Sequence, residues 1–183
     1  MAWNIDKFAA AWEFATLRHL GQTYGGRREG EHIPYINHLA SVATEVLWAI
    51  GAEPGWDADF AIQCALLHDV IEDTGTSFDT VASEFGIRVA QGVAALTKDS
   101  SIASPIAKMD DSLRRIRQQD KEVWVVKLAD RISNLNHPPF YWDRRKIEQY
   151  REEAQRILAA LGPANKKMAD RLAKKISGYP NAA

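Results

Sequence analysis

Cysteine is nearly absent from the sequence, since Cys64 is the only one among 183 residues. A disulfide within the chain and a zinc site made of cysteines are therefore excluded. Neither charge is in excess, with 23 lysines and arginines against 24 aspartates and glutamates, which argues against general binding to nucleic acid. There is no apolar run of membrane-spanning length and no basic-then-apolar leader. We therefore expect a cytoplasmic protein without a nucleic-acid or membrane partner.

The sequence is rich instead in helical periodicity. Apolar residues make up 46% of the chain and recur at helical spacing between glycines and prolines, whereas no strand with clean alternation is seen. We therefore expect residues 1–183 to form one all-α domain, a bundle of about eight to ten helices. The glycine-rich stretch from Gln22 to Gly30 is expected to be an open loop. The predicted helices cover residues 4–20, 35–50, 57–74, 78–85, 87–98, 122–135, 143–161 and 163–176, with a further helix around 114–117.

The segment 65–74 contains the most reactive combination of side chains. His68 and Asp69 stand side by side in an apolar run, and Glu72 and Asp73 follow. In a continuous helix, residues four apart share a face, so Glu72 would lie beside His68 and Asp73 beside Asp69. Three carboxylates next to a histidine are costly to bury unless a cation lies among them. A divalent metal ion would meet that need, although a core histidine followed by a solvated helix end fits this segment alone equally well.

Other parts of the chain favour the metal. Two imidazoles and two carboxylates suit a borderline transition metal such as Mn²⁺ or Fe²⁺, and a six-coordinate ion would keep two positions open. Such an ion makes a bound water nucleophilic near neutral pH, as phosphoester hydrolysis requires. Glu72 and Asp73 can then move protons. The candidate ligands come from three predicted helices and are His38, His68, Asp69 and Asp130.

Two further groups of polar residues are suited to a phosphorylated ligand. Arg27 and Arg28 lie in the glycine-rich loop, as a solvated charge pair, a fork for a phosphate or a platform for a base. On the helix predicted over 122–135, four polar residues share one edge. They are Lys127, Asp130, Arg131 and Asn134.

Five motifs, in order along the chain, carry a specific resemblance. They are Pro-Tyr-Ile-Asn-His (34–38), Ala-Leu-Leu-His-Asp-Val-Ile-Glu-Asp-Thr (65–74), Phe-Gly-x-x-Val-Ala (85–90), Leu-Thr-Lys (96–98) and Val-Lys-Leu-Ala-Asp-Arg-x-x-Asn-Leu (126–135). Together they resemble the HD-domain hydrolase of the RelA/SpoT family. Because no synthetase or regulatory domain accompanies the motifs, the chain is most similar to the free-standing small alarmone hydrolases of that family.

This resemblance implies a substrate and a set of residue roles. The implied reaction removes the 3′-pyrophosphate from guanosine 3′,5′-bis(diphosphate) or its triphosphate relative, giving pyrophosphate and GDP or GTP. Glu72 and Asp73 are implied as the catalytic acid and base pair. The implied ligands of a single Mn²⁺ ion are His38, His68, Asp69 and Asp130. The implied substrate-binding residues are Arg27 and Arg28 against the purine, Asn134 near the ribose, and Lys127.

The sequence also departs from the family pattern, and other functions stay open. Leu39 replaces the proline that usually follows the first metal histidine, and the loop before Pro34 is longer than usual. Because that loop is expected to read the base, adenosine 3′-pyrophosphates are an open alternative. So are an HD phosphohydrolase of another specificity, such as a nucleotide or NADPH phosphatase, and a non-catalytic nucleotide-binding module. The presence of both Glu72 and Asp73 argues against the last of these, and a homodimer is also open.

Overall fold

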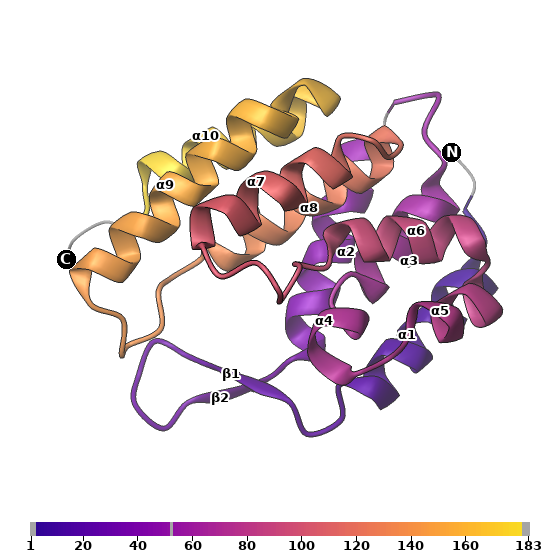
Figure 1. Cartoon of the computed structure of the whole chain (residues 1–183), viewed down its shortest axis with the longest axis horizontal. Helices are drawn as coiled ribbons and strands as arrows, with labels where there is room; N and C mark the ends of the chain where they lie inside the picture. Colours follow the sequence, from indigo (N-terminus) through magenta and orange to yellow (C-terminus); the bar gives the residue numbers. More distant parts are fainter. Residues whose placement is uncertain (1–2, 52, 181–183) are drawn as a thin grey trace.

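The protein is a bundle of α-helices with one small β-hairpin (Figure 1), so the predicted all-α class is confirmed. The computed structural model describes residues 3–51 and 53–180. Within these residues, no helix is both long enough and apolar enough to cross a membrane. In chain order the elements are α1 (Ile5–Arg18), β1 (Thr23–Gly25), β2 (His32–Pro34), α2 (Ile36–Ile50), α3 (Ala58–Leu67), α4 (Val70–Thr74), α5 (Phe78–Phe85), α6 (Ile87–Leu96), α7 (Pro105–Ile116), α8 (Lys121–Asn134), α9 (Arg144–Leu161), η1 (Gly162–Ala164, a 3₁₀ turn) and α10 (Lys166–Ser177).

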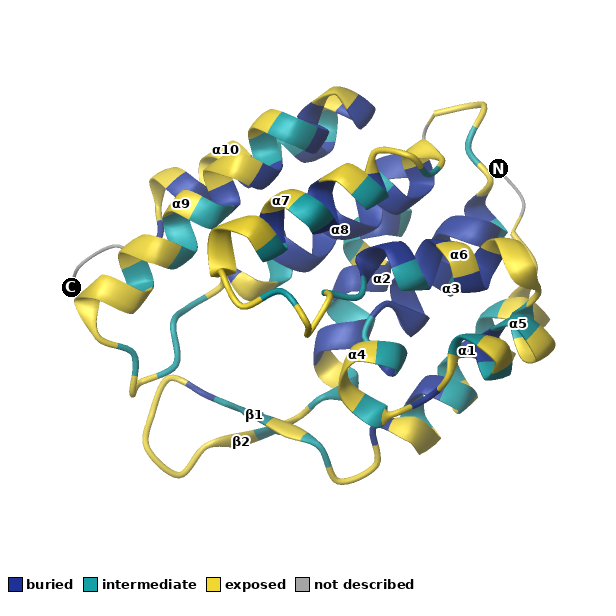
Figure 2. Cartoon of the chain, viewed as in Figure 1, coloured by how far each residue is buried: buried dark blue, intermediate teal, exposed yellow. Residues whose placement is uncertain are grey.

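Helices α2, α3 and α8 form the centre of the bundle, where each packs against the other two. Helix α8 lies deep in the molecule, and every residue from Val125 to Ile132 is buried (Figure 2). A helix that is buried on all sides is normally apolar throughout. Here Lys127, Asp130 and Arg131 are buried as well. Buried charges require partners, so this part of α8 marks the place where the core becomes a polar site.

The segment that carries His68 and Asp69 is a broken helix, and the expectation of a continuous helix over 57–74 is wrong there. Helix α3 ends at Leu67 and α4 begins at Val70. The His68 ring explains the break, because its Nδ1 atom lies 2.8 Å from the carbonyl oxygen of Ala65. In a continuous helix that carbonyl would accept from the amide of Asp69, so the side chain competes with the backbone. Because the helix is interrupted between Leu67 and Val70, continuous-helix spacing no longer predicts that Glu72 lies beside His68.

The glycine-rich stretch expected to be an open loop forms a hairpin instead. Strands β1 and β2 pair antiparallel, with Tyr24 opposite Ile33 and Gly25 opposite His32. The amide of Gly26 donates to the carbonyl of Glu31 at 3.1 Å, which extends the pairing toward the turn. A Cβ atom on Gly26 would lie 2.6 Å from the Cβ atom of Glu31, so a larger residue would fit here only if the facing segment shifted. Strands of three residues are too short to show the alternation that predicts a strand.

Candidate functional site

Three helices of the core bring their polar side chains to one point. His38 lies in the first turn of α2, His68 follows the end of α3, and Asp130 lies near the end of α8. The Nε2 atoms of the two histidines are 3.3 Å apart. The Oδ1 atom of Asp130 is 3.5 Å from Nε2 of His38 and 4.0 Å from Nε2 of His68. The predicted convergence of these three side chains is therefore present in the structure.

The hydrogen bonds of the imidazoles orient their ring nitrogens toward this point. Nδ1 of His68 faces the carbonyl of Ala65, which only accepts, so that nitrogen carries the proton. Nδ1 of His38 lies 3.2 Å from the hydroxyl of Ser133. Metal-binding histidines commonly use one nitrogen for such a contact and the other for the ion. Two Nε2 atoms that face each other at close range fit a shared cation.

Asp69 completes the cluster from the side of the helix break. Its Oδ2 atom lies 2.9 Å from Nε2 of His68 and 3.8 Å from Nε2 of His38, and it accepts a hydrogen bond from the hydroxyl of Tyr35. Burial disfavours an ionised Asp69, but the adjacent His68 outweighs burial and holds the pKa of Asp69 below its usual range. The cluster therefore contains a second anionic carboxylate, contributed by the segment between α3 and α4.

The cluster attracts positive charge. Burial disfavours an ionised Asp130, but the ammonium of Lys127, 2.8 Å from its Oδ2 atom, outweighs burial and holds the pKa of Asp130 well below its usual range. Burial lowers the pKa of His68, yet Asp69 and Asp130 outweigh burial and raise it to about 9. A proton or a metal ion can satisfy the same negative charge. Two imidazoles and two carboxylates match the ligands preferred by Mn²⁺, Fe²⁺ or Zn²⁺.

Both candidate catalytic acids lie on α4 beside the cluster. Glu72 accepts from the amide of Lys98 at 2.9 Å and from its ammonium at 3.0 Å. Asp73 accepts from the side-chain amide of Gln22 at 3.3 Å. Burial and the nearby charge of Asp69 raise the pKa of Asp73 above its usual value. A carboxylate with a raised pKa is a better proton acceptor near neutral pH.

These groups surround one cavity of about 340 Å³, named here the phosphate cavity. It combines the acids of the site with basic side chains, as a metal-assisted phosphoester site would. Its polar lining comprises Asp69, Glu72, Asp73, Lys98, Lys127, Asp130, Arg131, Asn134, Lys146 and Glu153. Asn134 donates to Oδ1 of Asp130 at 2.5 Å, so Lys127 and Asn134 each bind one oxygen of the same carboxylate.

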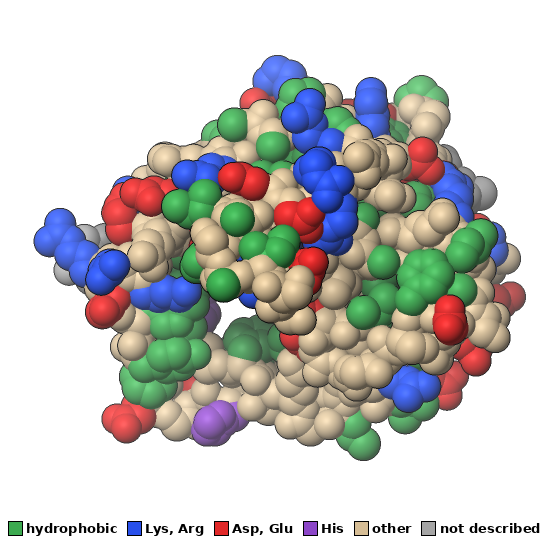
Figure 3. All heavy atoms as spheres, viewed as in Figure 1, with side chains coloured by type: hydrophobic (Ala, Val, Ile, Leu, Met, Phe, Trp, Pro, Cys, Tyr) green, Lys and Arg blue, Asp and Glu red, His purple; other side chains and the backbone are tan. Residues whose placement is uncertain are grey.

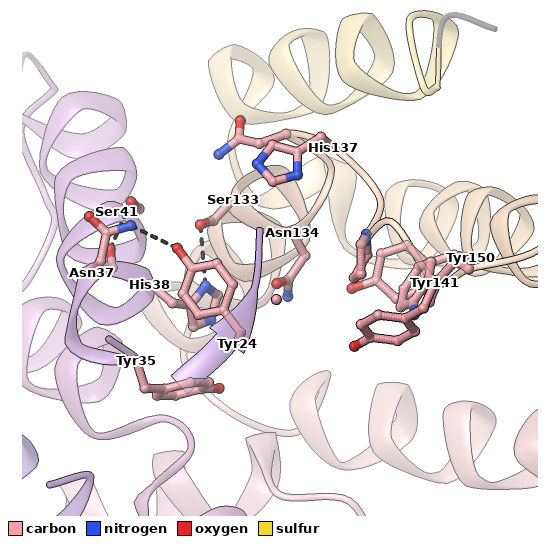
Figure 4. Close-up of a pocket in the computed structure, with 14 residues that line it drawn as sticks. Tyr24, Tyr35, Asn37, His38, Ser41, Ser133, Asn134, His137, Tyr141 and Tyr150 are labelled. Atoms are coloured by element: carbon pink, nitrogen blue, oxygen red, sulfur yellow. Dashed lines mark hydrogen bonds between the residues drawn. The ribbon is translucent and has the colours of Figure 1, made fainter. Parts of the chain in front are cut away.

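A second cavity of about 280 Å³, named here the aromatic cavity, has His38 in its wall (Figure 4). In the space-filling view a hollow opens between the hairpin and the helices (Figure 3). Its walls come from β1, the start of α2, the end of α8 and the segment before α9. The side chains labelled in the close-up are Tyr24, Tyr35, Asn37, His38, Ser41, Ser133, Asn134, His137, Tyr141 and Tyr150.

The structure does not bring Arg27 and Arg28 to either cavity. Both are exposed at the turn of the hairpin, and neither lines the phosphate cavity or the aromatic cavity. The backbone amide of Arg28 donates to the Glu31 carboxylate at 3.1 Å, which stabilises the turn. Of the predicted site residues, these two alone lie apart from the cluster and its cavities.

Several residues of the site were missed from the sequence. Tyr35 holds Asp69, and Lys98 holds Glu72. Tyr35 and Lys98 both belong to motifs identified in the sequence, but the sequence did not predict which side chains they contact. Arg115 on α7 donates to the carbonyls of Ala94, Ala95 and Thr97 at 2.8–3.1 Å, which fixes the end of α6 just before Lys98. Carbonyl partners leave no sequence signal, so no pattern could have revealed this role.

Comparisons with known proteins extend the likeness over nearly the whole chain. A family model for the HD domain matches residues 11–168. The Mus musculus protein guanosine-3′,5′-bis(diphosphate) 3′-pyrophosphohydrolase MESH1 is 31% identical over 173 residues, covering 88% of each chain. The probable GTP pyrophosphokinase of Mycobacterium leprae is 32% identical over 157 residues, which cover 84% of this chain and 19% of that protein. A solved structure of a metazoan SpoT orthologue that hydrolyses ppGpp has a TM-score of 0.80 at 25% identity, covering 97% of both chains.

Proposed function

This chain belongs to the HD-domain family, and from that premise we propose that it hydrolyses guanosine 3′,5′-bis(diphosphate) at its 3′-pyrophosphate with a divalent metal ion. The products are pyrophosphate and GDP, or GTP when the substrate carries a 5′-triphosphate. The named activity of the mouse relative and of the metazoan SpoT orthologue supports this substrate. The match to the mouse protein covers 88% of each chain, which supports the same reaction here.

One observation carries the proposal: the Nε2 atoms of His38 and His68 face each other at 3.3 Å between Asp69 and Asp130. This donor set fits a single divalent ion, and we assign Mn²⁺, which is the metal that the family resemblance implies and one that such a set can hold. When bound, the ion supplies Lewis acidity and lowers the pKa of water, which phosphoester hydrolysis needs at neutral pH. The four ligands are those that the resemblance implies.

Glu72 and Asp73 move the protons of the reaction in this proposal. Asp73 has the raised pKa, so we assign it the general base that takes a proton from the attacking water. Glu72 is assigned the general acid that gives a proton to the departing 3′-oxygen of the ribose. Its bonds to Lys98 hold the carboxyl group in a fixed orientation. The phosphorus–oxygen bond to the ribose breaks, and pyrophosphate leaves with the new oxygen.

The basic side chains of the phosphate cavity bind the pyrophosphate group in this proposal. Lys98, Lys127 and Lys146 line that cavity and offer three ammonium groups to the phosphate oxygens. Asn134 lines both cavities and contacts the substrate near the ribose in this proposal. Arg27 and Arg28, exposed at the hairpin turn, act at longer range by attracting the highly charged substrate.

Three finer statements complete the proposal. The substrate range includes adenosine 3′-pyrophosphates as well as the guanosine compounds. Residues 1–183 act as one HD-type domain, as the family match over residues 11–168 supports. The location is cytoplasmic, because nucleotides of this kind are cytoplasmic solutes.

The test is a product analysis over a panel of nucleotides, using the purified protein with Mn²⁺ and, as a control, with excess EDTA. We expect pyrophosphate from guanosine and adenosine 3′-pyrophosphates, and no release of orthophosphate from 5′-monophosphates or NADPH. Orthophosphate from those compounds would instead identify a phosphatase of another specificity. Saturable nucleotide binding without any product would identify a non-catalytic binding module.

A further inference from the structure

The aromatic cavity adjoins the metal ligands but takes no part in the proton and metal chemistry. It shares Tyr35, Asn134, Trp142 and Tyr150 with the phosphate cavity, so one ligand can occupy both. Its volume of about 280 Å³ lies near the lower end of small-molecule pockets. The walls combine tyrosine and tryptophan rings with a few amide and hydroxyl groups, which suits a flat heterocycle with a polar edge.

We infer that Tyr24, in the wall of the aromatic cavity, is the residue on which the base of the substrate stacks. The inference rests on the proposed function, because it places the two ends of one nucleotide in the two adjacent cavities. It differs from the role that the family resemblance implies for Arg27 and Arg28. Those arginines are exposed at the hairpin turn, whereas Tyr24 lines the cavity itself.

The ring of Tyr24 is held ready for stacking. The amide of Asn37 donates to the Tyr24 hydroxyl at 2.7 Å, and the ring lies edge-on to Tyr35 with centroids 6.4 Å apart (Figure 4). These contacts come from the first turn of α2 and from the residue that precedes it, and they hold the Tyr24 side chain in place. A ring that is already ordered loses little conformational entropy when a base stacks on it.

The far wall of the cavity is closed by a contact between the hairpin and the segment before α9. A Cβ atom on Gly25 would lie 3.1 Å from Cε1 of Tyr141 and 3.9 Å from Cβ of Pro139. The glycine therefore allows the Tyr141 ring to lie against the β1 backbone. Tyr141 remains 64% exposed, so much of its ring is also available to a ligand.

The polar groups of the cavity are not fully used by the protein. Nδ1 of His137, one of the lining residues, is buried and has no hydrogen-bond partner in the part of the chain that the structure describes. The Tyr24 hydroxyl accepts from Asn37 and keeps its own proton free to donate. Ring stacking tolerates any purine. The few polar groups of the cavity can form hydrogen bonds with the edge of the base. We therefore expect guanosine and adenosine 3′-pyrophosphates to be cleaved within roughly 100-fold of each other.

The experiment compares Tyr24→Ala and Tyr24→Phe with a matched control, Thr23→Ala, at the exposed neighbouring position of the same strand. Steady-state kinetics with Mn²⁺ and each 3′-pyrophosphate give KM and kcat separately. We expect Tyr24→Ala to raise KM roughly 10- to 100-fold for both purines with kcat nearly unchanged, as loss of one stacking ring predicts. Tyr24→Phe keeps the ring and should restore most of the affinity, and Thr23→Ala should match the wild type.

A binding measurement separates failure of this inference from failure of the proposed function. Calorimetric titration with GDP or ADP requires no turnover, and Tyr24→Ala should weaken both as it raises KM. If the wild type releases no pyrophosphate but binds GDP through Tyr24, the proposed reaction fails and the nucleoside site stands. If Tyr24→Ala keeps the KM and the GDP affinity of the wild type, the inference is wrong and the proposed reaction still stands. The same conclusion follows if Arg28→Ala, and not Tyr24→Ala, loses its affinity for GDP. A wild type without turnover and without GDP binding would overturn both.

Discussion

The cluster of His38, His68, Asp69 and Asp130 lies next to the hairpin, but the two regions differ in burial and in how their side chains are held. His38, His68 and Asp130 are buried on helices of the core, and their orientation is fixed by neighbouring side chains and carbonyls. The hairpin is a pair of three-residue strands, with an exposed turn at Arg27 and Arg28. Buried charged groups tolerate almost no change, whereas exposed ones tolerate many. The comparison suggests that the core determines the reaction and the hairpin determines the choice of substrate.

Removing a ligand of the cluster should have the largest effect. We expect His68→Ala to abolish both metal binding and pyrophosphate release. It should also lower the free energy of unfolding by about 3–5 kcal/mol, because Asp69 and Asp130 lose their shared partner. His32→Ala removes an exposed histidine from the hairpin and is the matched control. Metal content, product release and denaturant unfolding are measured on both, and a fully active His68→Ala protein in EDTA would contradict the metal assignment.

Changes to the acids of α4 test whether this side of the cluster acts on protons. Glu72→Gln and Asp73→Asn keep the shape of each side chain, and each should lower kcat by roughly 10²-fold while metal and nucleotide still bind. Glu84→Gln, an exposed acid on α5, is the control. Unchanged turnover with weakened binding would show that the two acids have a structural role.

The pH profile sharpens the same assignment. A general base must be ionised, so kcat should fall as the pH falls through the pKa of Asp73. Because burial and Asp69 raise that pKa, the decline should begin at a higher pH than an ordinary aspartate would give. In Asp73→Asn this acid limb should disappear from the residual activity. An identical acid limb in the wild type and the variant would assign it to another group.

Much of the cluster could be predicted from the sequence, because metal binding requires particular residue types. His38, His68, Asp69 and Asp130 stand in motifs, and helical periodicity predicted the core helices that carry or adjoin them. The break between α3 and α4 could not be predicted, because it depends on the His68 ring competing for the carbonyl of Ala65. The domain assignment and the residue roles remain predictions.

The hairpin and its surroundings were much less predictable. Three-residue strands show no periodicity, and the aromatic cavity depends on Tyr141 meeting Gly25 from a distant part of the chain. The role of Arg115 depends on backbone carbonyls, which every residue has. Where a contact joins distant segments through the backbone, sequence patterns contain little information about it.

Two adjacent arginines on α7 allow a test of whether the bonds to the end of α6 stabilise the fold. Arg115 holds the end of α6 before Lys98, whereas Arg114 is 61% exposed and contacts only Asp111 among the described acids. We expect Arg115→Ala to lower the free energy of unfolding by about 2 kcal/mol, because three carbonyls lose a charged donor. Arg114→Ala should stay within about 0.5 kcal/mol of the wild type. If the two variants lower the free energy of unfolding equally, the bonds from Arg115 to the end of α6 do not contribute to stability.

The smallest effect is expected at the turn of the hairpin. Arg28→Ala should raise KM by roughly twofold to fivefold for guanosine and adenosine substrates alike, because an exposed charge attracts the nucleotide only weakly. The effect should fade as salt is added, since exposed charges are screened. Kinetics at low and high ionic strength measure both properties. A salt-independent effect confined to one base would mean that Arg28 reads the base edge.

Titration of the metal-free protein with Mn²⁺ tests the central claim most directly. Pyrophosphate release from guanosine 3′,5′-bis(diphosphate) and bound metal are followed together, with the His68→Ala protein in parallel. The cluster consists of the buried His38, His68 and Asp130 together with the half-buried Asp69. It predicts that activity rises in proportion to bound metal and saturates at one ion per chain. Full activity before any metal is added, or activity that requires a second ion, would contradict a single-metal hydrolytic centre at this cluster.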